Sequence, residues 1–228
     1  MRGRAALRRA PPEYFEESMR LGKQAVLVLT SIVLALMIAA VPASAQTAAA
    51  GGNAEKVAAL RPPAGAKVAI IVFEDLQCPD CARAAPLVEE VAKAQKVPVV
   101  RHDFPLPQHN FSTRAAVIAR YFDTKSKKLG DAWRDHVFAN QTAITPDNLN
   151  TYATKFAEAN GTTMPFFLDP SGALAAKVRA DFALGQRIGI QHTPTIFVVS
   201  NSSKGEPFVE VVDRSKLTEM IENMKNSK

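Results

Sequence analysis

The chain contains two cysteines, Cys78 and Cys81, and two residues separate them. A thiol pair at this spacing can alternate between a dithiol and a disulfide, and the thiolate is the form that reacts. A bridge over only two intervening residues restricts the unfolded chain little, so a purely structural staple is the weaker interpretation. Two cysteines cannot form a four-cysteine zinc site. Soft sulfur ligands could bind Cu(I), but no methionine-rich tract accompanies them. The pair therefore predicts redox chemistry without a bound metal.

The cysteine pair lies where a strand is expected to pass into a helix. Val68–Phe73 is a continuous apolar run, as in a strand covered on both faces. Pro79 suits the first position of a helix that reaches about Ala94, with a kink at Pro86. Cys78 would then meet the unpaired N–H groups and the positive dipole end of this helix. Lowering its pKa from about 8.5 to about 5 would raise the thiolate fraction at pH 7 from about 3% to about 99% and make the disulfide a stronger oxidant.

The rest of the sequence predicts the elements that must hold this pair. Val97–Asp103 is a second strand, and because a helix separates it from the first, the two should lie parallel in a right-handed βαβ unit. Thr195–Val199 and Pro207–Val212 predict a β-hairpin, followed by a last helix that Asp213 could cap. Helices are expected between the two strand pairs, near Phe111–Phe122, Lys128–Asn140, Pro146–Asn160 and Pro170–Ile188, with Thr145-Pro146 and Asp169-Pro170 as cap pairs. The order predicts an α/β fold.

Three stretches of the chain resemble a known family. They are Val72–Cys81 (VFEDLQCPDC), Arg101–Leu106 (RHDFPL) and Gln191–Phe197 (QHTPTIF). In this element order they resemble the DsbA-like thioredoxin-fold thiol:disulfide oxidoreductases, over about Lys67 to Asn226. The resemblance implies a thioredoxin-like fold with a helical insertion, at about 110–190, between the βαβ and ββα halves.

The resemblance also implies roles for single residues. It makes Cys78 the exposed nucleophile and Cys81 the more buried resolving thiol. Thr193 and Pro194 would form a cis-peptide loop that faces the sulfurs and holds a backbone edge open for a substrate. Many relatives carry a buried acid six residues before the first cysteine, and this chain has Val72 there.

Three further residues are expected to tune the site. Glu74 and Asp75 lie near the end of the first strand, and either of them is a candidate for the missing proton relay. Pro79 begins the helix, and Asp80 stands where strong oxidants of the family carry histidine. A carboxylate about 5 Å from the Cys78 thiolate would cost about 0.8 kcal/mol at water-like screening and about 3 kcal/mol at an effective dielectric of 20. We therefore expect a milder oxidant, and we expect Asp80→His to raise its reduction potential.

These features favour an enzyme that introduces disulfides into reduced protein substrates, with no cofactor. By resemblance, a membrane quinone-linked protein of the DsbB or vitamin K epoxide reductase type would reoxidise the pair. A disulfide isomerase or reductase is the alternative, because threonine before the proline is common among isomerases of this superfamily. Such isomerases usually dimerise through an N-terminal domain, which the short segment between Ala45 and Lys67 cannot build, so a monomeric oxidase is favoured. A copper-binding module is the non-catalytic alternative.

The amino-terminal segment predicts export. Ala25–Ala40 is uncharged and apolar, follows the basic residues Arg20 and Lys23, and runs into the Ala-x-Ala site of Val41–Ala45. We predict a signal peptide that is cleaved after Ala45 and a periplasmic or extracytoplasmic location. Met19 is an alternative start, since it would begin a signal peptide of conventional length. An uncleaved membrane anchor is the other interpretation, although the apolar run is shorter than the roughly 20 residues that span a bilayer.

The signal peptide is expected over residues 1–45, a flexible leader over 46–66 and the folded domain over 67–228. The chain of 228 residues has 28 basic and 22 acidic side chains, a net charge of +6. Six of the basic and three of the acidic residues lie before residue 46, which leaves 22 against 19, or +3. Because this remainder has no basic block or aromatic-interleaved basic stripe, a nucleic-acid partner is not expected.

Overall fold

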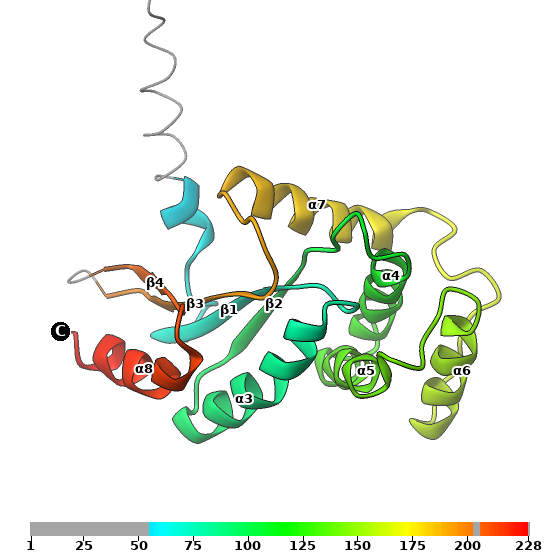
Figure 1. The fold of residues 1–228 in the computed structure, drawn as a ribbon, viewed down its shortest axis with the longest axis horizontal. Coiled ribbons are helices and arrows are strands. Elements are labelled where there is room, and N and C mark those ends of the chain that lie inside the picture. Colours follow the sequence, from blue (N-terminus) through cyan, green and yellow to red (C-terminus); the bar gives the residue numbers. More distant parts are fainter. Residues whose placement is uncertain (1–54, 203–205, 228) are drawn as a thin grey trace, which may run out of the picture. The chain divides into compact units, whose positions relative to one another are not determined.

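The computed structural model describes residues 55–202 and 206–227, and its fold is drawn in Figure 1. The strands are β1 (Val68–Glu74), β2 (Val99–Asp103), β3 (Thr195–Ser200) and β4 (Phe208–Glu210). The helices are α3 (Pro79–Gln95), α4 (Ser112–Asp123), α5 (Lys127–Asn140), α6 (Leu149–Ala159), α7 (Ala173–Arg187), the short 3-10 helix η1 (Arg214–Lys216) and α8 (Leu217–Asn226). The predicted signal peptide and its cleavage site lie outside the described residues.

One sheet with the strand order β2-β1-β3-β4 forms the centre of the fold. β1 pairs with β2 in parallel, which places Val72 opposite Arg101. β1 pairs with β3 in antiparallel fashion, and β3 continues into the hairpin with β4. The predicted parallel βαβ unit and the predicted hairpin are both confirmed, although β4 is shorter than expected. α3 continues through Pro86 as one helix.

The side chains of β1 alternate between two hydrophobic clusters, as the period of a strand requires. Ile70 and Val72 belong to the cluster that includes residues of α3 and α8, and Ile71 and Phe73 belong to the cluster that includes partly buried residues of α7. Figure 1 accordingly shows α3 and α8 on one side of the sheet and α7 on the other. Every residue of β1 is buried, which agrees with the unbroken apolar run Val68–Phe73, and Glu74 at the end of the strand is buried as well.

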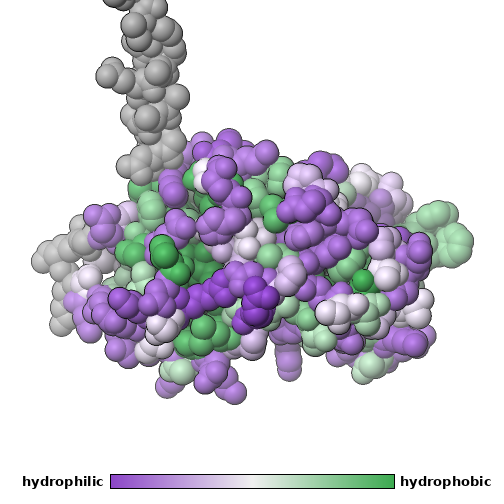
Figure 2. All heavy atoms as spheres, viewed as in Figure 1, coloured by the Kyte–Doolittle hydropathy of each residue, from purple (hydrophilic) through white to green (hydrophobic). Residues whose placement is uncertain are grey.

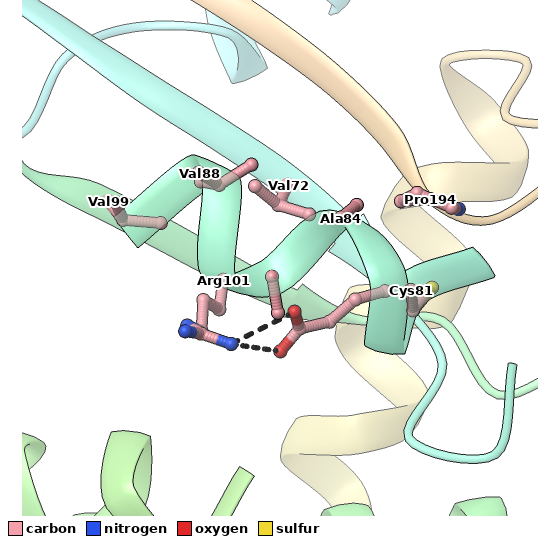
Figure 3. Close-up of a pocket in the computed structure, with 9 residues that line it drawn as sticks. Val72, Cys81, Ala84, Val88, Val99, Arg101 and Pro194 are labelled. Atoms are coloured by element: carbon pink, nitrogen blue, oxygen red, sulfur yellow. Dashed lines mark hydrogen bonds and ion pairs between the residues drawn. The ribbon is translucent and has the colours of Figure 1, made fainter. Parts of the chain in front are cut away.

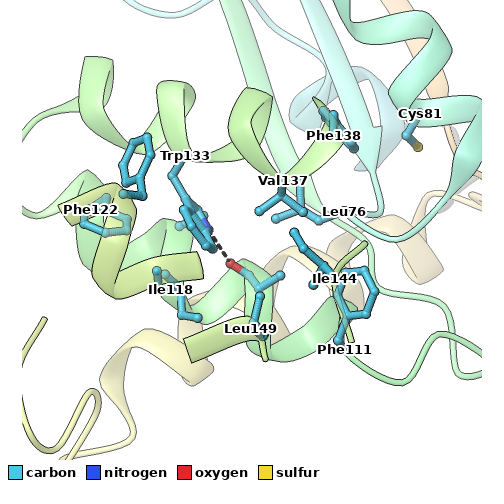
Figure 4. Close-up of a cluster of buried hydrophobic side chains, with 14 of the residues drawn as sticks. Leu76, Cys81, Phe111, Ile118, Phe122, Trp133, Val137, Phe138, Ile144 and Leu149 are labelled. Atoms are coloured by element: carbon cyan, nitrogen blue, oxygen red, sulfur yellow. Dashed lines mark hydrogen bonds between the residues drawn. The ribbon is translucent and has the colours of Figure 1, made fainter. Parts of the chain in front are cut away.

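The helices α4 to α7 form the predicted insertion between β2 and β3. Their core contains Phe122, Trp133 and Phe156, and the buried indole Nε1 of Trp133 donates a hydrogen bond to the Ala115 carbonyl at 3.0 Å (Figure 4). The same cluster includes Leu76 and both cysteines. The hydrophobic core of the insertion therefore extends up to the thiol pair.

Two helix starts differ from the prediction. α6 begins at Leu149, not at Pro146, because Thr145 and Asn148 hydrogen-bond each other's backbone N–H groups and form a turn before the helix. α7 begins at Ala173, and Asp169 accepts hydrogen bonds from the N–H groups of residues 174 and 175 at 3.1 and 2.8 Å. Gly172 is the N-cap residue, so the predicted cap pair is wrong in position, although the Asp169 side chain still accepts from the first turn and Pro170 lies in the turn before the helix.

Part of the predicted flexible leader packs onto the sheet. Residues 55–59 form a short helix, and Leu60 is fully buried in the cluster that contains Ile71. Glu55 also pairs with Arg187 of α7 at 2.5 Å. Because these contacts tie the segment down, the packed part of the chain begins before Lys67.

On the face seen in Figure 2, hydrophilic residues surround smaller apolar patches. Within residues 55–202 and 206–227, no helix combines the length and apolar character needed to cross a membrane.

Candidate active site

Cys78 is the residue from which α3 begins. It has extended backbone angles (φ −76°, ψ 120°) and is followed by Pro79 at the start of the helix, as the sequence predicts. Its N–H donates to the Asp75 carbonyl at 3.0 Å, and its sulfur lies 3.3 Å from the Thr193 carbonyl. This geometry directs the sulfur of Cys78 at the free N–H end of the helix and at the loop before β3.

The pKa of Cys78 is lowered to about 5. The largest cause is a hydrogen bond from the Cys81 thiol, and burial acts against it. The backbone N–H groups of Cys81 and Asp80, in the first turn of α3, lower the pKa further. The direction agrees with the expectation from the helix terminus, but the neighbouring thiol contributes more than the helix does.

Cys81 behaves in the opposite way. Its pKa is raised, chiefly by burial, then by its hydrogen bond to Cys78. The backbone N–H of Asp75 lies 3.4 Å from its sulfur. The residue is 2% exposed, and Cys78 is 7% exposed. The expectation of an exposed Cys78 is therefore wrong, because the 191–194 loop and the insertion cover most of it. Both thiols are free, so the structure represents the dithiol form.

Thr193 and Pro194 complete the site. The bond between them is a cis peptide, as the resemblance implies. The Thr193 carbonyl faces the Cys78 sulfur, and Pro194 lines a small pocket together with Cys81 (Figure 3). The structure thus brings together two residue pairs, Cys78 with Cys81 and Thr193 with Pro194, which lie more than 110 positions apart in the sequence.

Glu74 lies beside Val72 in this pocket. Both residues line it, because alternate positions of β1 face the same side. The Glu74 carboxylate is 4% exposed and pairs with Arg101 of β2 at 3.1 Å. Burial is the largest influence and raises its pKa, although Arg101 and Arg134 act to lower it. A buried acid is therefore present near Cys81, two residues along the strand from the position expected from the family.

Asp80 is paired, which the sequence does not reveal. Its carboxylate accepts hydrogen bonds from Arg214, one of them at 3.0 Å, and from Arg83 at 3.1 Å. The Arg214 hydrogen bonds are the largest cause of the lowered pKa of Asp80. The expected repulsion of the Cys78 thiolate was calculated for an unpaired carboxylate, so it is smaller in the folded protein.

Asp75 organises the loop before Cys78. Its buried carboxylate accepts hydrogen bonds from the N–H groups of Gln77 and Leu106 at 2.7 and 2.6 Å, and it lies 2.7 Å from His109 Nδ1. The sequence placed Asp75 near the site but gave no sign of these contacts, because Leu106 and His109 lie beyond the next strand. Within the described ranges no group of three or more His, Cys, Asp or Glu side chains could hold a metal ion.

A family model described as Thioredoxin matches residues 63–223, which is most of the chain. The sheet, the thiol pair at a helix start and the cis-proline loop define the class of thioredoxin-fold thiol:disulfide oxidoreductases. The chain belongs to the thioredoxin family. No protein of curated function matches it in sequence.

Solved structures with the same fold include proteins named DsbA and ScsC. One is alpha-DsbA2 of Wolbachia pipientis, described as a thiol-disulfide exchange protein (TM-score 0.56, 14% identity, 72% of this chain and 85% of that chain). Another is Pseudomonas aeruginosa DsbA2 (TM-score 0.54, 18% identity, 73% of this chain and 93% of that chain). A third is Proteus mirabilis ScsC in a transitional conformation (TM-score 0.59, 19% identity, 94% of this chain and 98% of that chain). The DsbA-like fold with its helical insertion, expected from the sequence, is confirmed.

Proposed function

We propose that this protein is an exported thiol:disulfide oxidoreductase that introduces disulfides into reduced protein substrates. One observation carries the proposal. The Cys78 sulfur lies at the start of α3 and 3.3 Å from the Thr193 carbonyl, in the loop that contains the cis peptide bond to Pro194. A thiol with a pKa of about 5 is almost wholly thiolate at pH 7, so it is a good leaving group.

In the proposed cycle the protein begins as the Cys78–Cys81 disulfide. A substrate thiolate attacks the Cys78 sulfur, and the sulfur–sulfur bond breaks to release the Cys81 sulfur, which takes up a proton because its pKa is raised. The second substrate thiolate then attacks the substrate sulfur of the mixed disulfide and releases the Cys78 thiolate. The substrate loses two electrons and gains a disulfide, and the protein gains the two electrons.

The pocket beside Cys81 supports a role for Glu74 in this cycle. Its carboxylate is buried, and its charge is among the influences that raise the pKa of Cys81. Glu74 would keep the resolving thiol protonated and leave Cys78 as the only thiolate of the pair. Pro79 and Asp80 would tune the same thiolate from the first turn of the helix.

Reoxidation requires an acceptor of two electrons. We infer a membrane quinone-linked protein of the DsbB or vitamin K epoxide reductase type, in agreement with export by the predicted signal peptide. The protein would act as a monomer and without a cofactor. Asp80, an acidic residue between the cysteines, favours a milder oxidant and keeps disulfide isomerase or reductase as the second candidate.

Two measurements test the proposal. Alkylation rates of the reduced Cys81→Ala variant, followed against pH, should show whether Cys78 titrates well below free cysteine, although loss of the Cys81 hydrogen bond will raise the value above that of the wild type. Thiolate absorbance of the reduced wild-type protein should give a midpoint near pH 5. A midpoint near 8.5 in the wild type, the value of free cysteine, would refute the proposed chemistry.

The direction of exchange needs a separate assay. Rapid oxidation of a reduced dithiol peptide by the disulfide form supports an oxidase. Rescue of a protein with scrambled disulfides, without added oxidant, supports the isomerase.

A further inference from the structure

The carboxylate between the two cysteines is held by an arginine from the far end of the chain. Both terminal nitrogens of Arg214 contact the two oxygens of Asp80, one pair at 3.0 Å, across 134 positions of sequence. Such a fork-to-fork pair fixes the orientation of the carboxylate as well as balancing its charge. Arg83 contacts one of these oxygens at 3.1 Å, but its side chain is 69% exposed, against 31% for Arg214.

Arg214 is itself fixed by the fold. It begins η1, whose first turn is capped by Asp213, which accepts a hydrogen bond from the Ser215 N–H at 3.0 Å. η1 leads directly into α8, where Leu217 and Ile221 are fully buried in the cluster that includes residues of α3. The arginine is therefore presented to α3 by an anchored element.

The position of the Asp80 carboxylate matters for Cys78. Asp80 follows Cys78 by two residues, and its N–H is among the groups that stabilise the thiolate. A carboxylate free to rotate could approach the thiolate, and like charges repel strongly at short range in a partly buried site. The Arg214 pair holds the carboxylate on α8's side of the helix. With the pair formed, neither the Asp80 carboxylate nor the Arg214 guanidinium is among the main influences on the pKa of Cys78. Loss of Arg214 would act by releasing the carboxylate.

We propose that Arg214 is a positioning residue of the redox site, which sets the oxidising strength of the cysteine pair by holding the Asp80 carboxylate. The proposal deepens the proposed function and rests on it. No other described residue contacts both oxygens of this carboxylate. The site would thus include a third segment, η1, besides the helix start and the cis-proline loop.

The test compares Arg214→Gln with Arg214→Lys, in the wild-type background and in Asp80→Asn. Two quantities are measured on each folded variant: the pKa of Cys78, from thiolate absorbance, and the equilibrium of the cysteine pair with glutathione. Arg214→Gln should raise the pKa by about 0.5 to 1 unit and shift the equilibrium about 3- to 10-fold toward the protein disulfide. Arg214→Lys keeps the charge without the fork and should give an intermediate shift.

The Asp80→Asn background separates positioning from direct action. Without a carboxylate to hold, Arg214→Gln should cause less than half of the shift seen in the wild-type background. Lys216→Gln is the matched control, because it removes a positive charge from the same element without touching Asp80. It should leave both quantities unchanged.

Three results would overturn the proposal. The first is an Arg214→Gln protein with an unchanged pKa of Cys78. The others are a pKa shift from Arg214→Gln that is equal in the wild-type and Asp80→Asn backgrounds, and a pKa shift from Lys216→Gln that equals that from Arg214→Gln. Circular dichroism and denaturant unfolding of each variant exclude a loss of fold as the cause. A wild-type Cys78 that titrates near 8.5 would instead refute the proposed function, and the differences between variants would still decide the role of Arg214.

Discussion

The pKa values of the two thiols are shifted in opposite directions, although both residues lie at the first turn of α3. Cys78 has a lowered pKa of about 5, and Cys81 has a raised one. The hydrogen bond from Cys81 is the largest cause of the lowered pKa of Cys78, and the free N–H groups at the start of α3 lower it further. Burial is the largest cause of the raised pKa of Cys81, and its hydrogen bond to Cys78 raises it further.

This asymmetry predicts a pH-dependent stability of the reduced protein. A lowered folded pKa contributes stability that is absent below about pH 5, grows as the pH rises above it, and is complete above the unfolded value of 9.0. At pH 7 the contribution should be about 3 kcal/mol. The measurement is urea unfolding of the reduced wild type and of Cys78→Ser at pH 5, 7 and 9. Parallel stabilities of the two proteins across this range would contradict the assigned pKa.

At Gly185, α7 closely approaches the rings of Phe73 and Phe104. A Cβ added at Gly185 would lie 2.5 Å from the Phe104 ring and 3.3 Å from the Phe73 ring. A glycine is thus required by close approach of the helix, even though glycine inside a helix costs about 1 kcal/mol relative to alanine.

Gly185→Ala should therefore destabilise the protein by about 1 to 2 kcal/mol, since overpacking outweighs the gain in helix propensity. Ala180→Gly, the reverse exchange at an exposed position of the same helix, is the control and should cost about 1 kcal/mol. Both values come from denaturant unfolding. A Gly185→Ala protein more stable than the wild type would show that the rings move aside without penalty.

Across the whole molecule, buried charges connect the sheet to the insertion. Arg134 of α5 is 2% exposed at its side chain and forms two 3.0 Å hydrogen bonds with Asp123 of α4. It also lies 3.7 Å from Asp103 of β2 and from Glu74 of β1. The carboxylates of both strands are buried, so each depends on nearby arginines for its charge.

Arg134→Met should destabilise the protein by about 3 to 5 kcal/mol, because it removes the bidentate partner of Asp123 and one of the two arginines that offset the buried charges of Glu74 and Asp103. Lys127→Met on the same helix is the matched control. Its ion pair with Asp131 is exposed, with 66% of the lysine side chain accessible, so its loss should cost less than about 1 kcal/mol. Thermal and urea unfolding of both variants measure the difference. Equal losses of unfolding free energy in the two proteins would contradict the stabilising role of Arg134 beside the buried carboxylates.

The sequence predicts those parts of the molecule that depend on neighbours along the chain. The apolar run of β1, Pro79 and the cysteine spacing specify a strand, a helix start and a thiol pair, and all three are found. The Thr193–Pro194 loop could be placed only through the family resemblance, since nothing local fixes its distance from Cys78.

The ion pairs could not be predicted from the sequence. Arg101 and Arg214 look like ordinary surface residues there, and their partners come from other elements. The position of Arg101 is the one available signal, because it lies within the predicted strand Val97–Asp103 and so belongs to the sheet. For Arg214, 134 residues from Asp80, only the three-dimensional fold reveals the contact.

The hydrophobic cluster formed by α4, α5 and α6 also contains Cys78 and Cys81. Excising 112–187 to obtain a minimal strand-and-helix scaffold would open Leu76, Cys78 and Cys81 to water and remove the medium that keeps one sulfur protonated. The inserted helices are consequently not a detachable module. Changes to their packing will alter the exposure and the pKa values of the cysteines even when no residue near the thiols is substituted.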